Sequence, residues 1–373
     1  WSIRFRSRKI IKINNRMKKT LSPIIIDIPF VSPLTGETST QYKLIIRVWD
    51  GLEANPPFSE SYSKTVSNLN SSIGIQKVNI SRLVNDFVII RPSTNTSTGL
   101  INGNSQVWVQ TSVIYTTTDA ADLNLEQNVV KSLAVKGYTY GNEGANQETN
   151  ANNILIDYDE FNVSRTGIFM LPVFSQTSAI TTISYPNNEI NFSQTPIATT
   201  NSADSVKVMF VDVSETTLDT YIEIVYNGVT TTLNIIDECK YTPIDVVFFN
   251  KNGAEQSLTF FKEKTNSLKI KSESFESDRE QPSVSGQHQF VRYNTQARGS
   301  FKVNSGFVDE GLNETFRQLL LSDVVWIYDQ PSFTFTPVNV KTSTFEEKTR
   351  RKDRLINYEI EFEYSYNEIN NIW

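Results

Sequence analysis

Cysteine and histidine are almost absent from this sequence, whose 373 residues include only Cys239 and His288 of these two types. A lone cysteine forms no intramolecular disulfide and no multi-cysteine metal site, which excludes a disulfide-stapled secreted domain and a zinc ribbon. A lone histidine excludes multi-histidine metal sites and histidine-pair chemistry. We expect His288 to be a solvated loop residue and Cys239 to be structural, in line with the general tendency of free cysteine to be buried.

Apolar residues are also scarce. Hydrophobic residues make up 38% of the chain, whereas about 45–50% is usual for a soluble globular protein. No apolar run reaches the ~18–20 residues that a membrane-spanning helix needs, so we expect a soluble chain with no membrane span. The length predicts about two or three domains, each large enough to bury a core.

Enzyme motifs are missing as well. The sequence has no dinucleotide-binding glycine fingerprint, no Walker loop and no HExxH zinc motif. Residues 157–162 carry oxygen ligands but lack the glycine-containing loop of a calcium site, so a polar strand end explains them better. The 41 acidic residues offer too many carboxylate pairs for any one pair to indicate glycoside cleavage. We expect a protein that is not an enzyme, without catalytic residues, cofactor or bound metal.

What the sequence does contain begins with a basic amino terminus. Residues 1–19 hold 8 of the 35 basic residues and no acidic residue, which leaves 27 basic against 41 acidic residues, or a net charge of −14, in the remainder. Such an arm can bind nucleic acid or an acidic neighbouring subunit. Alternatively, translation starts at Met17, and the preceding residues are upstream sequence or a cloning remnant.

Short β-branched and aromatic runs separated by turn residues fill most of the chain, a spacing typical of sandwiches and barrels. We predict strands at 24–28, 42–49, 76–80, 107–115, 154–158, 168–174, 179–184, 205–213, 221–226, 229–235, 244–250, 257–262, 299–303, 324–328 and 338–342. Asn227 and Gly228 supply the pair of positive φ angles that a type I′ hairpin turn needs.

Two helices and two loops interrupt this pattern. We predict helices at 81–87, capped by Ser81, and at 313–322, capped by Asn313. The glycine, tyrosine and asparagine cluster at 137–146 is typical of a functional loop or a peripheral projection. Residues 271–289 are rich in Ser, Glu and Gln, so we expect an extended loop that orders only against a partner.

The last predicted strand has the most regular alternation. Aromatic and aliphatic residues at 358, 360, 362, 364 and 366 form one face, while Glu359, Glu361 and Glu363 form the other. Neighbouring carboxylates repel one another unless cations or solvent face them. The candidate partners are basic residues shortly before the strand: Lys348, Arg350, Arg351, Lys352 and Arg354. Our candidate interface consists of the three glutamates together with Arg350, Arg351, Lys352 and Arg354.

The sequence thus predicts a mainly β fold, built as several antiparallel β-sandwiches or barrels. We expect a basic arm at 1–19, a β-sandwich domain at 20–118, a second β-domain with a loop insertion at 119–237, and a barrel-like β-domain at 238–373 that carries the helix near 313–322.

Three stretches resemble virion proteins of tailed phages that infect Bacteroidetes-type bacteria. They are Val78-Asn79-Ile80-Ser81-Arg82-Leu83-Val84-Asn85-Asp86-Phe87, residues 239–253 with their Asn-Lys-Asn-Gly turn, and Asn357-Tyr358-Glu359-Ile360-Glu361-Phe362-Glu363-Tyr364. The carboxy-terminal order of strand, strand, helix and strands is also similar to the tail-tube-like domain of tube, distal tail and baseplate hub proteins.

This resemblance implies a structural subunit of a phage tail, neck or baseplate that forms a homo-oligomeric ring and contacts other virion proteins. The protein would then reside in the virion after assembly in the host cytoplasm. The acidic strand face would pair with a basic loop of the next subunit or line a lumen through which DNA passes without sticking.

A second interpretation is a glycan-binding, adhesin-like surface module, in which exposed Tyr138, Tyr140 and Trp108 stack on sugar rings. Packing of these aromatic side chains in a core or sheet is the alternative explanation for them. A capsule depolymerase would need a β-helix repeat, and the sequence has no such period.

Overall fold

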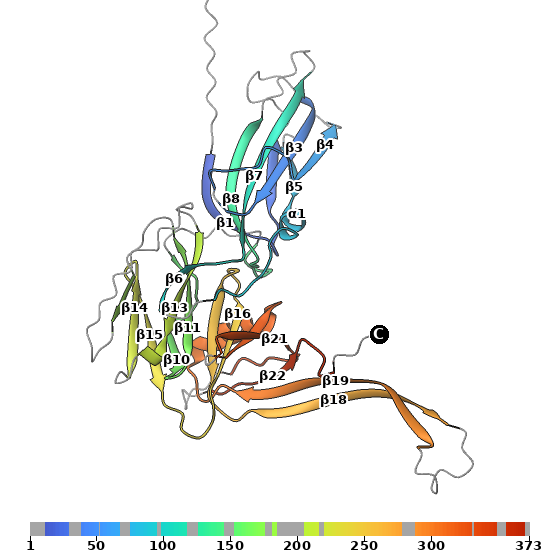
Figure 1. Ribbon diagram of the computed structural model, residues 1–373. Coiled ribbons are helices and arrows are strands. Elements are labelled where there is room, and N and C mark those ends of the chain that lie inside the picture. Colours follow the sequence, from blue (N-terminus) through green and yellow to red (C-terminus); the bar gives the residue numbers. More distant parts are fainter. Residues whose placement is uncertain are drawn as a thin grey trace, which may run out of the picture.

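The computed structural model describes residues 12–29, 39–51, 53–67, 75–94, 98–117, 126–144, 153–175, 181–184, 205–215, 220–277, 288–329, 332–348 and 356–369. Within these ranges the chain is mainly β, with several sheets and one short helix near the carboxy terminus, which confirms the predicted fold class (Figure 1). No helix in the described ranges is long and apolar enough to cross a membrane.

A five-stranded sheet lies at the top of Figure 1. Its strands are, in spatial order, β1 (Lys12–Lys19), β8 (Gln127–Val135), β7 (Gln106–Thr117), β3 (Ser39–Trp49) and β4 (Tyr62–Ser67). A smaller layer covers one face, formed by β2 (Ile25–Pro29), β5 (Ile75–Asn79) and α1 (Ser81–Asn85). Leu44 and Val109 of the sheet share a buried core with Ile28 and Val84 of this layer. Strands from the predicted arm and from beyond residue 119 therefore belong to the same sheet as those of 20–118.

The helix predicted at 81–87 is present but ends at Asn85. The expected role of Ser81 as its cap is wrong, because Ser81 is already helical and Ile80 precedes it without a side-chain cap bond. Instead, the Asn79 side-chain oxygen accepts hydrogen bonds from the backbone N–H of Ser81 at 3.0 Å and of Ile24 at 3.2 Å. One asparagine thus ties the helix start to the chain entering β2.

Two four-stranded sheets form the middle of the molecule. The first contains β6 (Gly99–Asn102), β13 (Ser205–Asp212), β11 (Ile168–Ser175) and β9 (Asn153–Ile154). The second contains β10 (Glu160–Ser164), β15 (Val229–Ile236), β14 (Tyr221–Tyr226) and β12 (Thr181–Ser184), and η1 (Val213–Glu215) follows β13. Phe169 and Leu171 of one sheet and Ile222 and Leu233 of the other are buried in one core.

The turn between β14 and β15 has the predicted chemistry, since Asn227 has φ of 49° and Gly228 has φ of 81°. Other strands differ from the predicted ones, since β1, β4, β6, β8, β10 and β18 (Thr265–Glu276) lie outside every predicted strand. Of the strand expected at 154–158, only Ile154 lies in a strand, as the second residue of β9. The pairs β1–β8 and β10–β15 are parallel, whereas the other pairs between described strands are antiparallel.

A seven-stranded sheet forms the lower part of the molecule. Its strands are, in spatial order, β17 (Glu255–Phe260), β16 (Ile244–Phe249), β20 (Val325–Asp329), β21 (Thr334–Val340), β22 (Glu359–Tyr364), β19 (Phe290–Asn304) and β18 (Thr265–Glu276). Every residue of β17 is buried, and every residue of the opposite edge strand β18 is exposed. The two edges of one sheet thus have opposite environments.

The helix near 313–322 is α3 (Asn313–Leu321), which follows the 3₁₀ turn η2 (Glu310–Leu312). The predicted capping role of Asn313 is wrong, because helical geometry has already begun before it. Asp309 is the cap, and its side chain accepts a hydrogen bond from the Gly311 N–H at 2.9 Å. Phe316 and Leu319 on the buried face of α3 join the core of the seven-stranded sheet.

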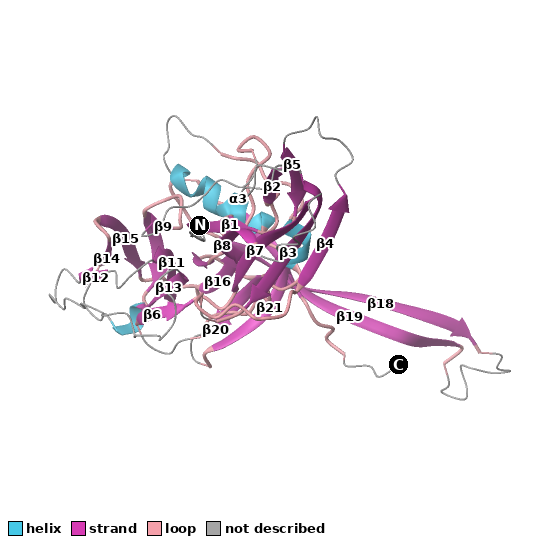
Figure 2. Ribbon diagram, turned by 90° about the horizontal axis from the view of Figure 1, so that it is seen from above, coloured by secondary structure: helices cyan, strands magenta, loops and turns pink. Residues whose placement is uncertain are grey.

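The extended loop predicted at 271–289 is wrong at its amino-terminal end, while its carboxy-terminal end agrees with the start of β19. Residues up to Glu276 continue β18, and β19 begins at Phe290, while 278–287 lie outside the described residues. The two strands leave the body as a ribbon, which Figure 2 shows projecting well beyond the other sheets. From here on we call this ribbon of β18 and β19 the arm, as distinct from the basic amino terminus. At about 3.3 Å per residue, the 12 residues of β18 span about 40 Å.

Candidate functional site

The three glutamates of the candidate interface lie on one face of β22, as predicted, and alternate with buried Ile360 and Phe362. Each has a cationic partner within the chain, in the pairs Glu359–Lys302 at 3.1 Å, Glu361–Lys341 at 2.5 Å and Glu363–Arg298 at 3.1 Å. The Lys341 ammonium holds the pKa of Glu361 below its usual range. The acidic face is therefore compensated by neighbouring parts of the same sheet.

The other members of the candidate interface, Arg350, Arg351, Lys352 and Arg354, lie outside the described residues. Lys348, which precedes them, contacts the chain beside β22, since its ammonium donates to the Asn357 carbonyl at 2.7 Å. The pairing of β19 with β22 that supplies Arg298 and Lys302 joins segments about 60 residues apart, and alternating charges alone do not reveal this register.

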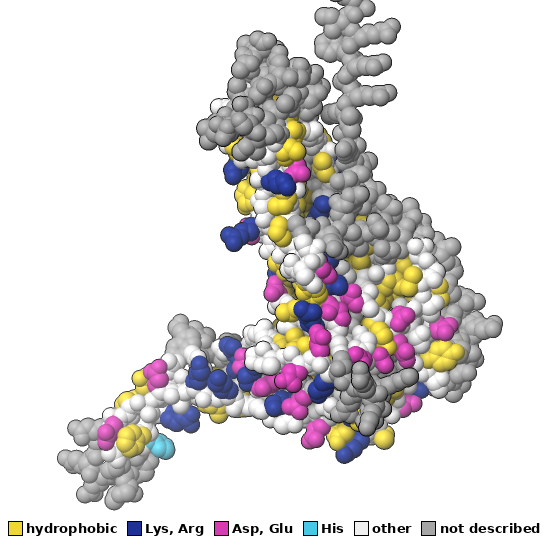
Figure 3. Space-filling model, turned by 180° about the vertical axis from the view of Figure 1, so that it is seen from behind, with side chains coloured by type: hydrophobic (Ala, Val, Ile, Leu, Met, Phe, Trp, Pro, Cys, Tyr) yellow, Lys and Arg dark blue, Asp and Glu magenta, His cyan; other side chains and the backbone are white. Residues whose placement is uncertain are grey.

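The arm presents two different faces, because side chains alternate along each strand. The register places Leu268 opposite Gly299 and Ile270 opposite Ala297 on one face, and Lys269 and Lys271 on the other. Nearer the tip, the rings of Phe275 and Tyr293 are in contact, with centroids 5.8 Å apart. Figure 3 shows Lys and Arg side chains gathered at the base of the arm and the histidine near its far end. His288 is exposed, as predicted.

The 137–144 segment, predicted as a functional loop or projection, packs against the turn between β16 and β17. The Tyr138 N–H donates to the Lys251 carbonyl at 2.9 Å. A Cβ at Gly137 would lie 2.7 Å from the Lys251 carbonyl oxygen, and a Cβ at Gly253 would lie 2.7 Å from the Gly137 nitrogen. Both glycines are needed because two backbones meet here without room for a side chain. We call this contact the junction.

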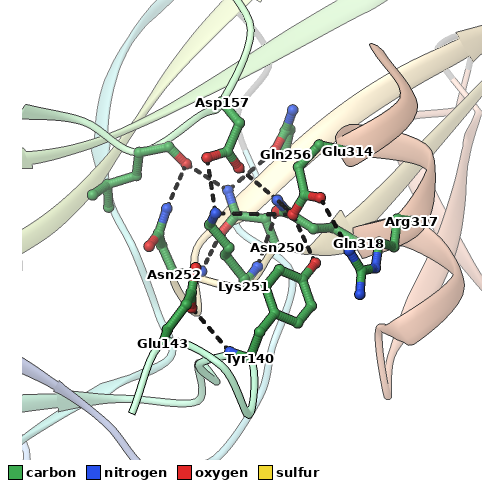
Figure 4. A network of polar contacts seen from close by, with 11 residues as sticks. Tyr140, Glu143, Asp157, Asn250, Lys251, Asn252, Gln256, Glu314, Arg317 and Gln318 are labelled. Carbon is green, nitrogen blue, oxygen red and sulfur yellow. Dashed lines mark hydrogen bonds and ion pairs between the residues drawn. The ribbon is translucent and has the colours of Figure 1, made fainter. Parts of the chain in front are cut away.

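A polar network surrounds the junction (Figure 4). The Lys251 ammonium lies 3.0 Å from Asp157 and 3.8 Å from Glu314 of α3. The Tyr140 hydroxyl donates to Glu314 at 2.7 Å, and the Arg317 guanidinium lies 4.2 Å from the centre of the tyrosine ring. Burial and the bond to Glu314 raise the pKa of Tyr140. The network holds the 137–144 segment, the chain before β10 and α3 together.

These contacts bear on the glycan interpretation. Trp108 is only 4% exposed and packs with Leu133 and Phe174 between the five-stranded sheet and the middle sheets, so its expected exposure is wrong. Tyr138 and Tyr140 are half-buried at the junction. The rings thus have the packing role that was the alternative explanation, and glycan binding stays an untested prediction.

Two carboxylates are buried where the seven-stranded sheet meets other parts of the chain. Asp245 accepts hydrogen bonds from the Ile168 N–H at 3.1 Å and from the Thr259 hydroxyl at 2.6 Å, and burial raises its pKa to about 6. Glu255 accepts from the Ser93 N–H with both oxygens at 3.0 Å, and burial raises its pKa to about 7. Each carboxylate binds a backbone group of another segment, and sequence reasoning identified neither.

Residues with known metal or nucleophile chemistry are scattered. Cys239 is exposed, so the expectation that it is buried is wrong. In the run at 157–162, Asp157 binds Lys251, and Glu160 begins β10 and accepts from Asn234 at 2.7 Å. Among the described residues, no group of three or more His, Cys, Asp or Glu side chains is arranged to hold a metal ion.

Comparison with family models and with curated proteins finds no match for this chain.

Proposed function

We propose that this protein is a non-enzymatic structural subunit that assembles into a homo-oligomeric ring in the virion of a tailed phage. The observation that carries the proposal is the arm formed by β18 and β19, in which all 12 residues of the outer strand are exposed. A two-stranded ribbon is marginally stable alone in water, and a long exposed edge strand promotes uncontrolled pairing with other chains. Assembly with a neighbour removes both problems.

The virion assignment rests on the three resembling stretches described above. In the fold they form the end of β5 with α1, the β16 hairpin with the junction turn, and β22. The hairpin and β22 belong to the sheet that carries the arm. The carboxy-terminal order is four strands, α3 and three strands. Compared with the order of strand, strand, helix and strands on which the resemblance was based, the helix again lies between two groups of strands, and the hairpin of the arm is additional.

Native mass spectrometry of the full chain tests the assembly part of the proposal. We expect one closed oligomer that persists at about 1 µM, the concentration at which an interface with a Kd in the micromolar range is half occupied. A chain that stays monomeric even at about 100 µM would refute a ring. Protein mass spectrometry of purified phage particles that encode the chain tests the virion part, and absence from the particles contradicts it.

A further inference from the structure

Resting on the proposed oligomer, we propose that the base of the arm, defined as Leu268, Lys269, Ile270 and Lys271 on β18, binds a second copy of this chain. The contact combines an apolar face with a basic one. It deepens the proposed function by naming the surface through which the subunits associate.

The apolar face is incomplete within one chain. Leu268 is 53% exposed and Ile270 is 52% exposed. Their cross-strand neighbours on β19 are Gly299 and Ala297, which are too small to cover them. Because β18 is the last strand of the sheet, no further strand of the described chain lies beside them. Exposed leucine and isoleucine in adjacent positions on a free edge are typical of a protein interface.

The basic face also lacks a partner of opposite charge within the part of the chain that the structure describes. The register places Lys269 opposite Arg298 and Lys271 opposite Gln296, and like charges in opposite positions destabilise a strand pair. Arg298 has Glu363 as its partner, but no ion pair involves Lys269 or Lys271 among the described residues.

The charge of the whole chain favours another copy as the partner. Strands β18 and β19 carry five basic and two acidic residues, a net charge of +3. Since the chain has a net charge of −6, the rest of it has a net charge of −9. A basic arm with an acidic body gives each copy both halves of a complementary pair. Nucleic acid would satisfy the lysines but would leave the apolar face uncovered.

The opposite edge of the same sheet does not receive the arm. Strand β17 is buried along its whole length, and its Ser257 hydroxyl accepts a hydrogen bond from the Met170 N–H of β11 at 2.8 Å. A neighbour therefore cannot extend this sheet through β17. Pairing of two arms would bring their lysines together, which like charges disfavour. The arm therefore contacts another, acidic surface of the second copy, which gives a head-to-tail contact of the kind that closes into rings.

The test uses the full chain with Leu268→Glu and Ile270→Glu together, measured by native mass spectrometry and light scattering. Both residues are more than half exposed, so the double substitution should change the unfolding midpoint no more than ordinary surface substitutions do. We expect association to weaken at least about tenfold. The matched control is Ile89→Glu with Val229→Glu, which changes two residues that are 60% and 53% exposed on other elements and should leave the oligomer intact.

Two further measurements distinguish the possible outcomes. Lys269→Glu with Lys271→Glu should also weaken association, and the wild-type oligomer should weaken as salt is raised from about 0.05 to about 0.5 M. Amide hydrogen exchange of β18 should slow when subunits associate. A wild-type oligomer that the arm variants leave unchanged overturns the arm contact alone, whereas a wild-type monomer overturns the ring as well. Protection of β18 that appears only when duplex DNA is added also overturns the contact, in favour of nucleic-acid binding.

Discussion

The buried carboxylate of Glu255 should make the stability of the fold depend on pH, and Glu255→Gln should remove that dependence. Glu255 is 2% exposed on β17, and its only hydrogen-bond donor in the described structure is Ser93. Among the described residues no cation contributes to its environment, so burial dominates and favours the neutral acid. Glutamine has nearly the same shape, is neutral at every pH, and keeps an oxygen that can accept the Ser93 N–H.

The size of the effect follows from the two pKa values. Burial raises the pKa of Glu255 from the ordinary 4.5 to about 7, so the folded chain holds the proton more tightly than the unfolded chain. The stability gained from this proton is complete below the unfolded value and is lost as the pH rises through the folded value. The difference corresponds to about 3 kcal/mol, of which about 2 to 3 kcal/mol disappears between about pH 5 and about pH 8.

Chemical unfolding followed by tryptophan fluorescence measures this directly, because the chain has five tryptophans. The variant and the wild type should have similar free energies of unfolding near pH 5, and the variant should be more stable by about 2 to 3 kcal/mol near pH 8. Asp245 is present in both proteins, so its own titration cancels in the comparison. The control is Glu346→Gln at an exposed position, whose free energy of unfolding should depend on pH as that of the wild type does. A constant difference between Glu255→Gln and wild type across this range would refute the reasoning.

The remaining predictions concern the junction and the candidate interface. Gly137→Ala should destabilise the fold by about 1 to 3 kcal/mol in chemical unfolding, because its Cβ would meet backbone at 2.7 Å, and an unchanged midpoint would contradict the close approach. Tyr140→Phe should cost about 1 kcal/mol by removing the bond to Glu314, while the ring contacts remain; equal stability of the two proteins would mean that the bond contributes nothing. Reversing the charge of Arg350 and Arg351 together should weaken assembly, read by native mass spectrometry, more than it lowers the unfolding midpoint. Normal assembly of this double variant in moderate salt would mean that the segment with Arg350 and Arg351 is only a solvated turn.

Strands were predictable where the pattern was local. The alternation in 358–366 identified β22 and its buried face, and Asn227 with Gly228 identified the turn that joins β14 to β15. In both cases the information lies within about ten residues and follows from side-chain alternation or from backbone preference. The helix near 313–322 was predictable for the same reason, although its cap was not, because the 3₁₀ turn before it starts the helical geometry early.

The junction was not predictable because its residues are distant in sequence. Gly137 and Gly253 lie 116 positions apart, and each looks like an ordinary turn glycine until the two backbones meet. The same holds for Tyr140, whose partner Glu314 lies 174 positions away. A polar and aromatic loop of this composition is equally compatible with an exposed binding loop, which is why a functional or projecting loop was expected at 137–146. Only the pairing of distant segments decides between these possibilities.

The low apolar content has a structural cause that composition alone does not indicate. Strand β9 pairs only with Val173 and Phe174 of β11, so the N–H groups earlier in β11 that point away from β13 have no strand on that side. Side chains of the seven-stranded sheet take that place, since Asp245 accepts from Ile168 and Ser257 accepts from Met170. These polar residues are buried because an edge must be satisfied, and apolar residues in their positions would leave backbone donors unpaired at about 1 to 3 kcal/mol each. Part of the scarcity of apolar residues thus reflects strand edges that polar side chains close inside the molecule, whereas the edge strand β18 is exposed along its whole length.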